Sequence, residues 1–426
     1  MTMKIDKDLA KSILHALEGG MVPENGLPYI TVGRKEETLA ILHDMDWIAQ
    51  GYSTFRLMEG AYGSGKSFMA RLTKNEALLR NFIVMECDLA PERKLCGTKK
   101  EGLETYRMLL SRMSTKNHPS GGALAQIMHD YYEMVAKNEA DDMTLKEKIM
   151  EMPHGFDFCA ALDCYKKAYE ENDSEKKMQS LRWLRGEFPN KTEAKKALGL
   201  SVIIEDSNWF SYIKIWGIFV REAGYQGMYL IFDELTQITR NIVNSTTREH
   251  NFERLLSIYN DCYGNQAKYI GVILCGIPSS IHDTKRGLFS YEALKSRLAS
   301  SKLQGEEILA SPILKLHMLT AEEFAVLIDR VEAIHACLQQ KDYYFTEEER
   351  ILFVDYQYQR IGASSHLTPR EFLKDYMTIL NLKAEKRTED SMEDFLYRAG
   401  GIDFSASMIG KDEEEDAVLS YENFSL

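Results

Sequence analysis

The chain has 426 residues, of which 44% are hydrophobic and 27% are charged, and its net charge is -13. This length exceeds one ordinary domain and allows a large buried core, while the acidic balance argues against a protein that coats nucleic acid over its whole surface. No apolar stretch approaches the roughly 18 residues of a membrane span, and the N-terminus lacks the order of a secretory signal. Seven irregularly spaced cysteines predict reduced thiols in a cytoplasmic protein rather than a disulfide framework or a zinc site.

Residues 1–122 predict alternating helices and strands. An amphipathic helix and a segment punctuated by Pro and Gly come first, and a helical run follows Gly33-Arg34. Short apolar runs predict strands at 54–59 and 82–87, with a glycine-rich turn and a helix between them.

Residues 123–206 are mostly helical in pattern, and strand signals return only after a helix at 209–222. The runs 228–232, 269–274 and 313–316 are almost continuously apolar, as expected for a parallel sheet that is covered on both faces. After 318 the sequence predicts helices alone, opened by capping boxes at Thr320, Thr346 and Thr368. The acidic run 412–416 predicts a flexible tail.

The glycine-rich turn after the first strand matches the pattern of a phosphate-binding P-loop. Its glycines let successive backbone N–H groups point at phosphate oxygens, and the helix that follows adds its positive end. Lys66 is expected to neutralise the terminal phosphates of ATP, and the Ser67 hydroxyl to bind Mg²⁺. The expected nucleotide-binding residues are Gly60, Ala61, Tyr62, Gly63, Ser64, Gly65, Lys66 and Ser67.

Two acids follow the apolar run 228–232. Asp233 is expected to hold Mg²⁺, and Glu234 to orient or deprotonate the attacking water. A strand that ends in an acidic turn is common by itself. Beside a P-loop, an adjacent Asp-Glu pair favours ATP hydrolysis over binding alone.

Further positions fit an AAA+ arrangement, in which an arginine of one subunit reaches the nucleotide of its neighbour. Arg297 is the first candidate for this finger and Arg286 the alternative, although a solvated helix arginine explains Arg297 equally well. Arg370 begins a helix from which it can face the phosphates, and Arg34 fits either an adenine-side turn or a plain helix entry. The polar residue expected after 269–274 is replaced by Cys275-Gly276, so we expect turnover that is slow or depends on a partner.

These motifs predict an α/β fold of the P-loop NTPase type, AAA+-like, with a parallel sheet sandwiched by helices, a helical insertion and a C-terminal helical lid domain. The expected divisions are an N-terminal helical segment at 1–30, an ATPase core at 31–122 and 207–317, the insertion at 123–206, the lid at 318–400 and the tail at 401–426.

Several segments resemble the BREX-associated ATP-binding proteins, a BrxD-like family of bacterial phage-defence ATPases. The similarity runs from Ala16 to Met377 and is most particular in LAPERKLCG and RGLFSYEALKSRL; the other matching segments are ALEGGMVPENGLPYITVGR, GAYGSGKS, YLIFDEL and IYNDCYG. The resemblance implies an AAA+-type ATPase of an anti-phage system, often encoded beside a helicase-like protein. It also implies nucleotide roles for Lys66 and Ser67, and metal and hydrolysis roles for Asp233 and Glu234.

Phage defence makes DNA a candidate partner, and residues 176–196 contain seven basic residues but only two acidic ones. Trp183 and Phe188 lie among them, a mixture that suits phosphate contact and base stacking. The alternative is that the aromatic residues belong to the core and that the basic residues are a solvated helix face. The candidate DNA contacts are Lys176, Lys177, Arg182 and Arg185.

Two functions stay open at this point. The first is an ATPase that drives or times a defence complex, with an active site completed in trans by Arg297 and therefore a homo-oligomer. The second is a nucleotide-dependent switch or scaffold that assembles on DNA or a partner protein with little turnover. Glu234 favours the first, and Cys275-Gly276 the second.

Overall fold

The computed structural model describes residues 5–299, 310–359 and 368–400, which form two compact units. One unit comprises Met1–Thr38, Gly60–Leu72 and Leu316–Leu426, and the other comprises Leu39–Glu59 and Thr73–Lys315, so that the division falls within two helices, α3 and α4. Within the described ranges, no helix is both long and apolar enough to cross a membrane.

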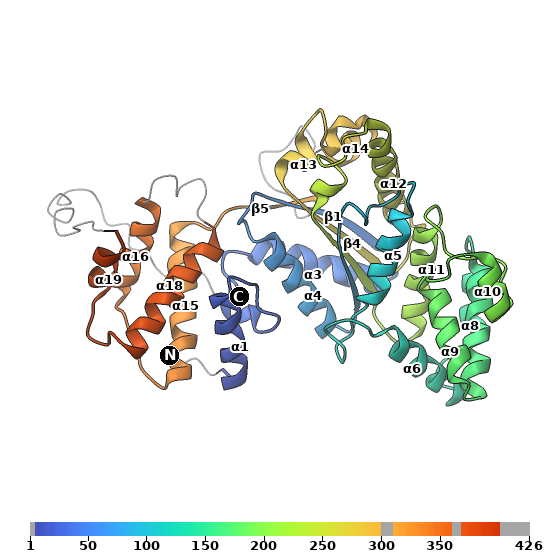
Figure 1. The fold of residues 1–426 in the computed structure, drawn as a ribbon, viewed down its shortest axis with the longest axis horizontal. Helices are drawn as coiled ribbons and strands as arrows, with labels where there is room; N and C mark the ends of the chain where they lie inside the picture. Colours follow the sequence, from blue (N-terminus) through green and yellow to red (C-terminus); the bar gives the residue numbers. More distant parts are fainter. Residues whose placement is uncertain (1–4, 300–309, 360–367, 401–426) are drawn as a thin grey trace. The chain divides into compact units, whose positions relative to one another are not determined.

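The larger unit contains a five-stranded sheet in the order β2-β3-β4-β1-β5. Figure 1 labels three of these strands, β1, β4 and β5. The pairs β2–β3, β3–β4 and β4–β1 are parallel, which confirms the α/β prediction. The connection that leaves β1 runs toward the β2 edge of the sheet, whereas the connection that leaves its neighbour β4 runs toward β5 at the opposite edge. In open α/β sheets, ligands bind beside the carboxyl ends of the strands at such a reversal. The strands are β1 (Ser53–Gly60), β2 (Ile83–Asp88), β3 (Met228–Asp233), β4 (Ile270–Gly276) and β5 (Ile313–Leu316).

Both faces of this sheet are buried, as the apolar runs predict. Met228, Leu230 and Phe232 of β3 join a core cluster with α5, α11 and α12, whereas the alternating residues Tyr229 and Ile231 are buried outside that cluster. The helices of this unit are α3 (Lys35–Ala49), α4 (Lys66–Leu79), α5 (Glu101–Ser111), α6 (Leu124–Ala136), α7 (Asp142–Met150), α8 (Gly155–Glu170), α9 (Ser174–Leu184), α10 (Lys191–Leu198), α11 (Trp209–Glu222), α12 (Ser245–Tyr263), α13 (Pro278–His282) and α14 (Glu292–Leu298), with short 3-10 turns at Leu235–Gln237 and Leu288–Ser290.

The helices α6–α10 pack onto the same core as the sheet. Tyr106 of α5 donates a hydrogen bond to the carbonyl of Leu184 at 2.7 Å and accepts one from Trp216 at 3.1 Å. Trp183 of α9 packs edge-on against Tyr212 of α11 at 5.7 Å between ring centroids. Aromatic contacts through α5 and α11 therefore join this helical segment to the strands.

Among its described residues, the smaller unit is built mainly from helices. It contains α1 (Lys7–Glu18), α2 (Leu27–Ile30), α15 (Ala321–Gln339), α16 (Glu347–Gln359), α18 (Pro369–Glu385) and α19 (Met392–Gly400). The predicted capping box at Thr320 is present in full, with Glu323 as its partner. Helix α1 packs against both α15 and α18.

Buried polar residues of α15 connect the helices of the smaller unit. The Glu332 carboxylate accepts hydrogen bonds from the Tyr376 hydroxyl and the Tyr344 backbone, each at 2.6 Å. The ring nitrogens of His335 lie 3.0 Å from the Tyr344 hydroxyl and 3.0 Å from Oδ1 of Asn381. Burial lowers the pKa of His335 below its ordinary value, against the opposing effect of the Asn381 hydrogen bond.

Candidate nucleotide site

The loop between β1 and α4 has the backbone that phosphate binding requires. Gly63 and Gly65 have φ angles of +83° and +89°, a region that glycine enters without a steric penalty. The strand before the loop ends at Gly60 and the helix after it begins at Lys66, as the motif predicts. The loop therefore precedes a helix N-terminus, where backbone N–H groups favour an anion.

The loop has close neighbours within its own unit. A Cβ atom at Gly60 would lie 2.1 Å from Oγ of Ser64, and one at Gly63 would lie 2.7 Å from Cγ2 of Thr368. The Ser64 side chain is buried, and its hydroxyl has no hydrogen-bond partner among the described residues. A glycine cradle with an unsatisfied buried hydroxyl fits the phosphates of ATP, because a phosphate oxygen can satisfy both N–H and O–H donors.

The Lys66 side chain folds back onto the phosphate loop. Its Nζ atom donates to the carbonyls of Gly60 and Ala61, each at 2.8 Å, and lies 5.5 Å from the ring centroid of Tyr62. The ammonium thus contacts two backbone carbonyls of the loop and the face of a loop tyrosine, and an anionic phosphate is a stronger partner than either of these groups.

Arg34 supports the same loop by a hydrogen bond to its backbone. Its guanidinium is buried and donates to the carbonyls of Ser64 and His317, each at 2.7 Å, and to the Glu37 carboxylate at 3.0 Å. The arginine therefore joins the start of α3, the phosphate loop and the segment after β5. This support of the loop was not apparent from the sequence, which suggested an adenine-side turn or a plain helix entry.

The start of α18 lies beside the loop in the same unit. Thr368 caps this helix by accepting a hydrogen bond from the Glu371 backbone at 3.3 Å, and its methyl group is the neighbour of Gly63 described above. Arg370 is exposed in the first turn, and its side chain runs along Gly20, where an added Cβ would lie 3.0 Å from Cγ of the arginine. Thr368 was not recognised as a site residue from the sequence, because only the fold brings it to the loop.

The predicted acid pair lies at the carboxyl end of β3. Asp233 is the last residue of the strand, and its carboxylate accepts a hydrogen bond from the Glu234 backbone at 2.8 Å. Glu234 has φ +64°, a strained conformation for a residue other than glycine, and such strain often accompanies function. Asp88 pairs with Asp233 in the β2–β3 register and forms an ion pair with Arg112 at 2.7 Å, so a third carboxylate lies at this edge of the sheet.

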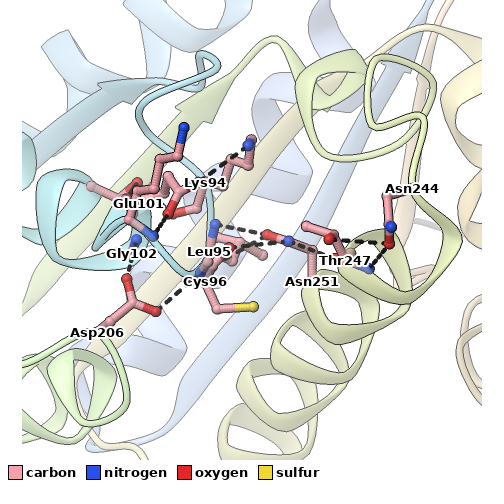
Figure 2. Close-up of polar contacts among 12 residues, drawn as sticks. Lys94, Leu95, Cys96, Glu101, Gly102, Asp206, Asn244, Thr247 and Asn251 are labelled. Atoms are coloured by element: carbon pink, nitrogen blue, oxygen red, sulfur yellow. Dashed lines mark hydrogen bonds and ion pairs between the residues drawn. The ribbon is translucent and has the colours of Figure 1, made fainter.

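A network of hydrogen bonds fixes the loop after β2, which includes the LAPERKLCG segment (Figure 2). The Asp206 carboxylate accepts from the backbone of Gly97, Gly102 and Leu103 at 3.0, 2.6 and 3.2 Å. From α12, the Asn251 side chain accepts from the backbone of Leu95 and Cys96 and donates to the Cys96 carbonyl. The segment that carries the most particular resemblance is therefore a rigid loop, held by charged and amide side chains from distant parts of the chain.

Arg297, the first finger candidate, lies on the exposed side of α14. Its guanidinium donates to Asn260 of α12 at 3.1 Å and to the carbonyl of Ala293 at 2.9 Å. Arg286, the alternative, is also exposed and lies in the loop between α13 and α14. Both arginines are thus accessible to another molecule.

The basic segment 176–196 has a partly neutralised surface. Lys176 pairs with Asp173 at 3.4 Å, and Arg185 pairs with Glu187 at 3.0 Å. Trp183 and Phe188 are 1% and 3% exposed, so the alternative interpretation of these aromatic residues as core is confirmed, and stacking on bases is not open to them in this conformation. DNA contact through the basic side chains stays a prediction.

Comparison with known proteins places the chain in a family. No match to the chain was found among curated proteins. The family model of the BREX system ATP-binding protein BrxC/D matches residues 5–397, which include the phosphate loop, the acid pair and the helices α15, α16 and α18. The chain therefore belongs to the BrxC/D family of BREX system ATP-binding proteins.

Proposed function

We propose that the protein is a magnesium-dependent AAA+-type ATPase that works in BREX defence as an oligomeric motor or timer, together with DNA, a helicase-like protein or another defence protein. The phosphate loop carries this proposal: its left-handed glycines, the buried Ser64 hydroxyl and the Lys66 ammonium together suit a triphosphate. In this assignment Lys66 binds the terminal phosphates, and Arg34 supports the loop.

Asp233 and Ser67 are the proposed ligands of Mg²⁺, which shields phosphate charge when bound. Glu234 is the proposed base, and its strained backbone fixes where its carboxylate is presented. The sheet supports this grouping, because Leu57 of β1 and Phe232 of β3 both pair with Leu274 of β4. Glu234 therefore follows a strand that is two positions from β1 in one sheet, a lateral separation of about 10 Å.

We further propose that Arg297 completes the site of a neighbouring copy and that Arg370 contacts the phosphates within its own copy. The exposure of Arg297 supports the first role, and the packing of Thr368 against the phosphate loop supports the second. The role of Arg297 predicts that ATP promotes assembly.

A second function, a nucleotide-dependent switch or scaffold with little turnover, is supported by the end of β4. Cys275 is fully buried, and Gly276 has no side chain, so neither position offers a polar group to water.

Measurements of ATP affinity, phosphate release and assembly state on three proteins separate the two functions. For the ATPase, Lys66→Ala should lose ATP binding, whereas Glu234→Gln should bind ATP and assemble but lose at least about 100-fold in kcat. Equal, slow hydrolysis by the wild type and Glu234→Gln, with ATP-dependent assembly intact, would select the switch. A wild type that binds no adenine nucleotide would refute both.

A further inference from the structure

The end of β4 has no space for the polar side chain that the sequence lacks there. A Cβ atom at Gly276 would lie 2.8 Å from Cδ2 and 3.0 Å from Cβ of Leu235. Leu235 is fully buried and directly follows Glu234, so it has little freedom to move aside. The packing of the acidic turn thus explains the glycine at this strand end.

The neighbouring strand places a charged residue at the same level. Glu59 of β1 is the register partner of Gly276, and it directly precedes Gly60, the first glycine of the phosphate loop. Its carboxylate lies 2.9 Å from Nε2 of His282, the last residue of α13. The Glu59 side chain is 9% exposed, whereas that of His282 is 42% exposed. The imidazole thus links a buried carboxylate to the surface of the molecule.

His282 is held in one orientation by a second contact. Its ring packs edge-on against Phe289, with 4.8 Å between the ring centroids. Phe289 lies in the segment between α13 and α14 and precedes the helix that carries Arg297. Through Glu59 and Phe289, His282 therefore connects the strand that leads into the phosphate loop with the segment that leads to the candidate finger.

We propose that Glu59 and His282 form a positioning pair for ATP hydrolysis, which replaces the polar residue that β4 cannot carry. This role rests on the function proposed above. The pair fixes α13 against the carboxyl end of β1, so that the segment after β4 keeps its place while the phosphate loop binds and releases nucleotide. A histidine is suited to this position because one ring nitrogen donates to the carboxylate while the other side of the ring faces solvent.

A purely structural pair and a positioning pair make different predictions. Removing His282 leaves the buried Glu59 carboxylate without this hydrogen-bond partner, so a purely structural pair would lower the thermal stability and the ATP affinity together. Small displacements of groups around a reacting phosphate, in contrast, reduce the rate strongly. The rate of hydrolysis at saturating ATP is therefore the informative quantity.

The test compares His282→Ala, His282→Gln and the control His250→Ala, which changes an exposed histidine of α12. We expect His282→Ala to lower kcat about tenfold with KM and ATP affinity within about twofold of the wild type. The amide of His282→Gln can still donate to Glu59, so this variant should keep at least about a third of the wild-type kcat. The His250→Ala variant should match the wild type.

Several outcomes would overturn the proposal. A wild-type kcat in His282→Ala refutes the pair alone and leaves the ATPase assignment standing. The same holds if both His282 variants lose ATP affinity and thermal stability together, since that pattern describes a structural contact. A wild type that binds ATP without turnover removes the positioning role but retains the switch, and absence of ATP binding removes the proposed function itself.

Discussion

Arg34→Ala tests whether the stability of the protein and its affinity for ATP depend on the hydrogen bonds that Arg34 makes to the phosphate loop. The substitution removes two hydrogen bonds to backbone carbonyls and leaves the Glu37 carboxylate, whose side chain is 12% exposed, without its ion-pair partner. Hydrogen bonds that involve a charged group contribute about 1.5–3 kcal/mol, and breaking a buried ion pair costs about 3–5 kcal/mol. These contributions overlap, so we expect a loss of about 4 kcal/mol in the free energy of unfolding.

Urea denaturation measures this loss. The m-values of the variant and the wild type should agree, which shows that both unfold by the same transition. The matched control is Arg80→Ala, because Arg80 is 40% exposed and pairs with an exposed Asp46 at 3.1 Å, so that its loss should cost less than about 1 kcal/mol. Arg34→Lys should recover only part of the loss, since an ammonium lacks the planar fork that serves three acceptors. ATP affinity should also fall at least about tenfold in Arg34→Ala. Stability and ATP affinity equal to those of Arg80→Ala would refute the supporting role.

Three further predictions concern packing, pH and nucleic acid. Gly276→Ala should lower the free energy of unfolding by about 1–3 kcal/mol in thermal or urea melts, because the new methyl group contacts the buried Leu235. The control Gly19→Ala should have little effect, because its new Cβ atom would lie 3.5 Å from the nearest atom, the Ala16 carbonyl oxygen. Burial lowers the pKa of His335, so the unfolded chain binds the proton more tightly than the folded protein. The stability of the wild type relative to His335→Gln should therefore decline as the pH falls from about 6.5 toward the lower folded-state pKa. A stability difference that stays constant between pH 8 and pH 5 would contradict this. Reversing the four candidate basic charges between 176 and 185 should weaken DNA binding and flatten its salt dependence, and unchanged binding isotherms at two salt concentrations would exclude this surface.

Local patterns in the sequence predicted the strands and the phosphate loop well. The run 313–316 has the same bounds as β5, and the helix 209–222 the same bounds as α11, because apolar periodicity and flanking polar residues define both. The motif from Gly60 to Ser67 is likewise local, since its eight residues are consecutive in the sequence.

The supporting contacts of the site could not be predicted, because they join residues far apart in the chain. Arg34 and Ser64 are 30 positions apart, and Glu59 and His282 are 223 apart. Only the packed fold brings such pairs together, and the sequence around one partner does not predict the other. The absence of a polar residue at Gly276 was visible in the sequence, but its cause, the side chain of Leu235, was not.

The contact between Gly276 and Leu235 also restricts how the two positions can diverge among relatives. Any larger residue at 276 places its Cβ atom 2.8 Å from Cδ2 of the leucine, so such a change should cost less stability when residue 235 is smaller. Position 235 follows the acid pair in sequence, and a smaller residue there opens space beside Glu234. The two sites should therefore vary together, and a relative that acquires a polar side chain at the end of β4 should have a residue smaller than leucine after its acid pair.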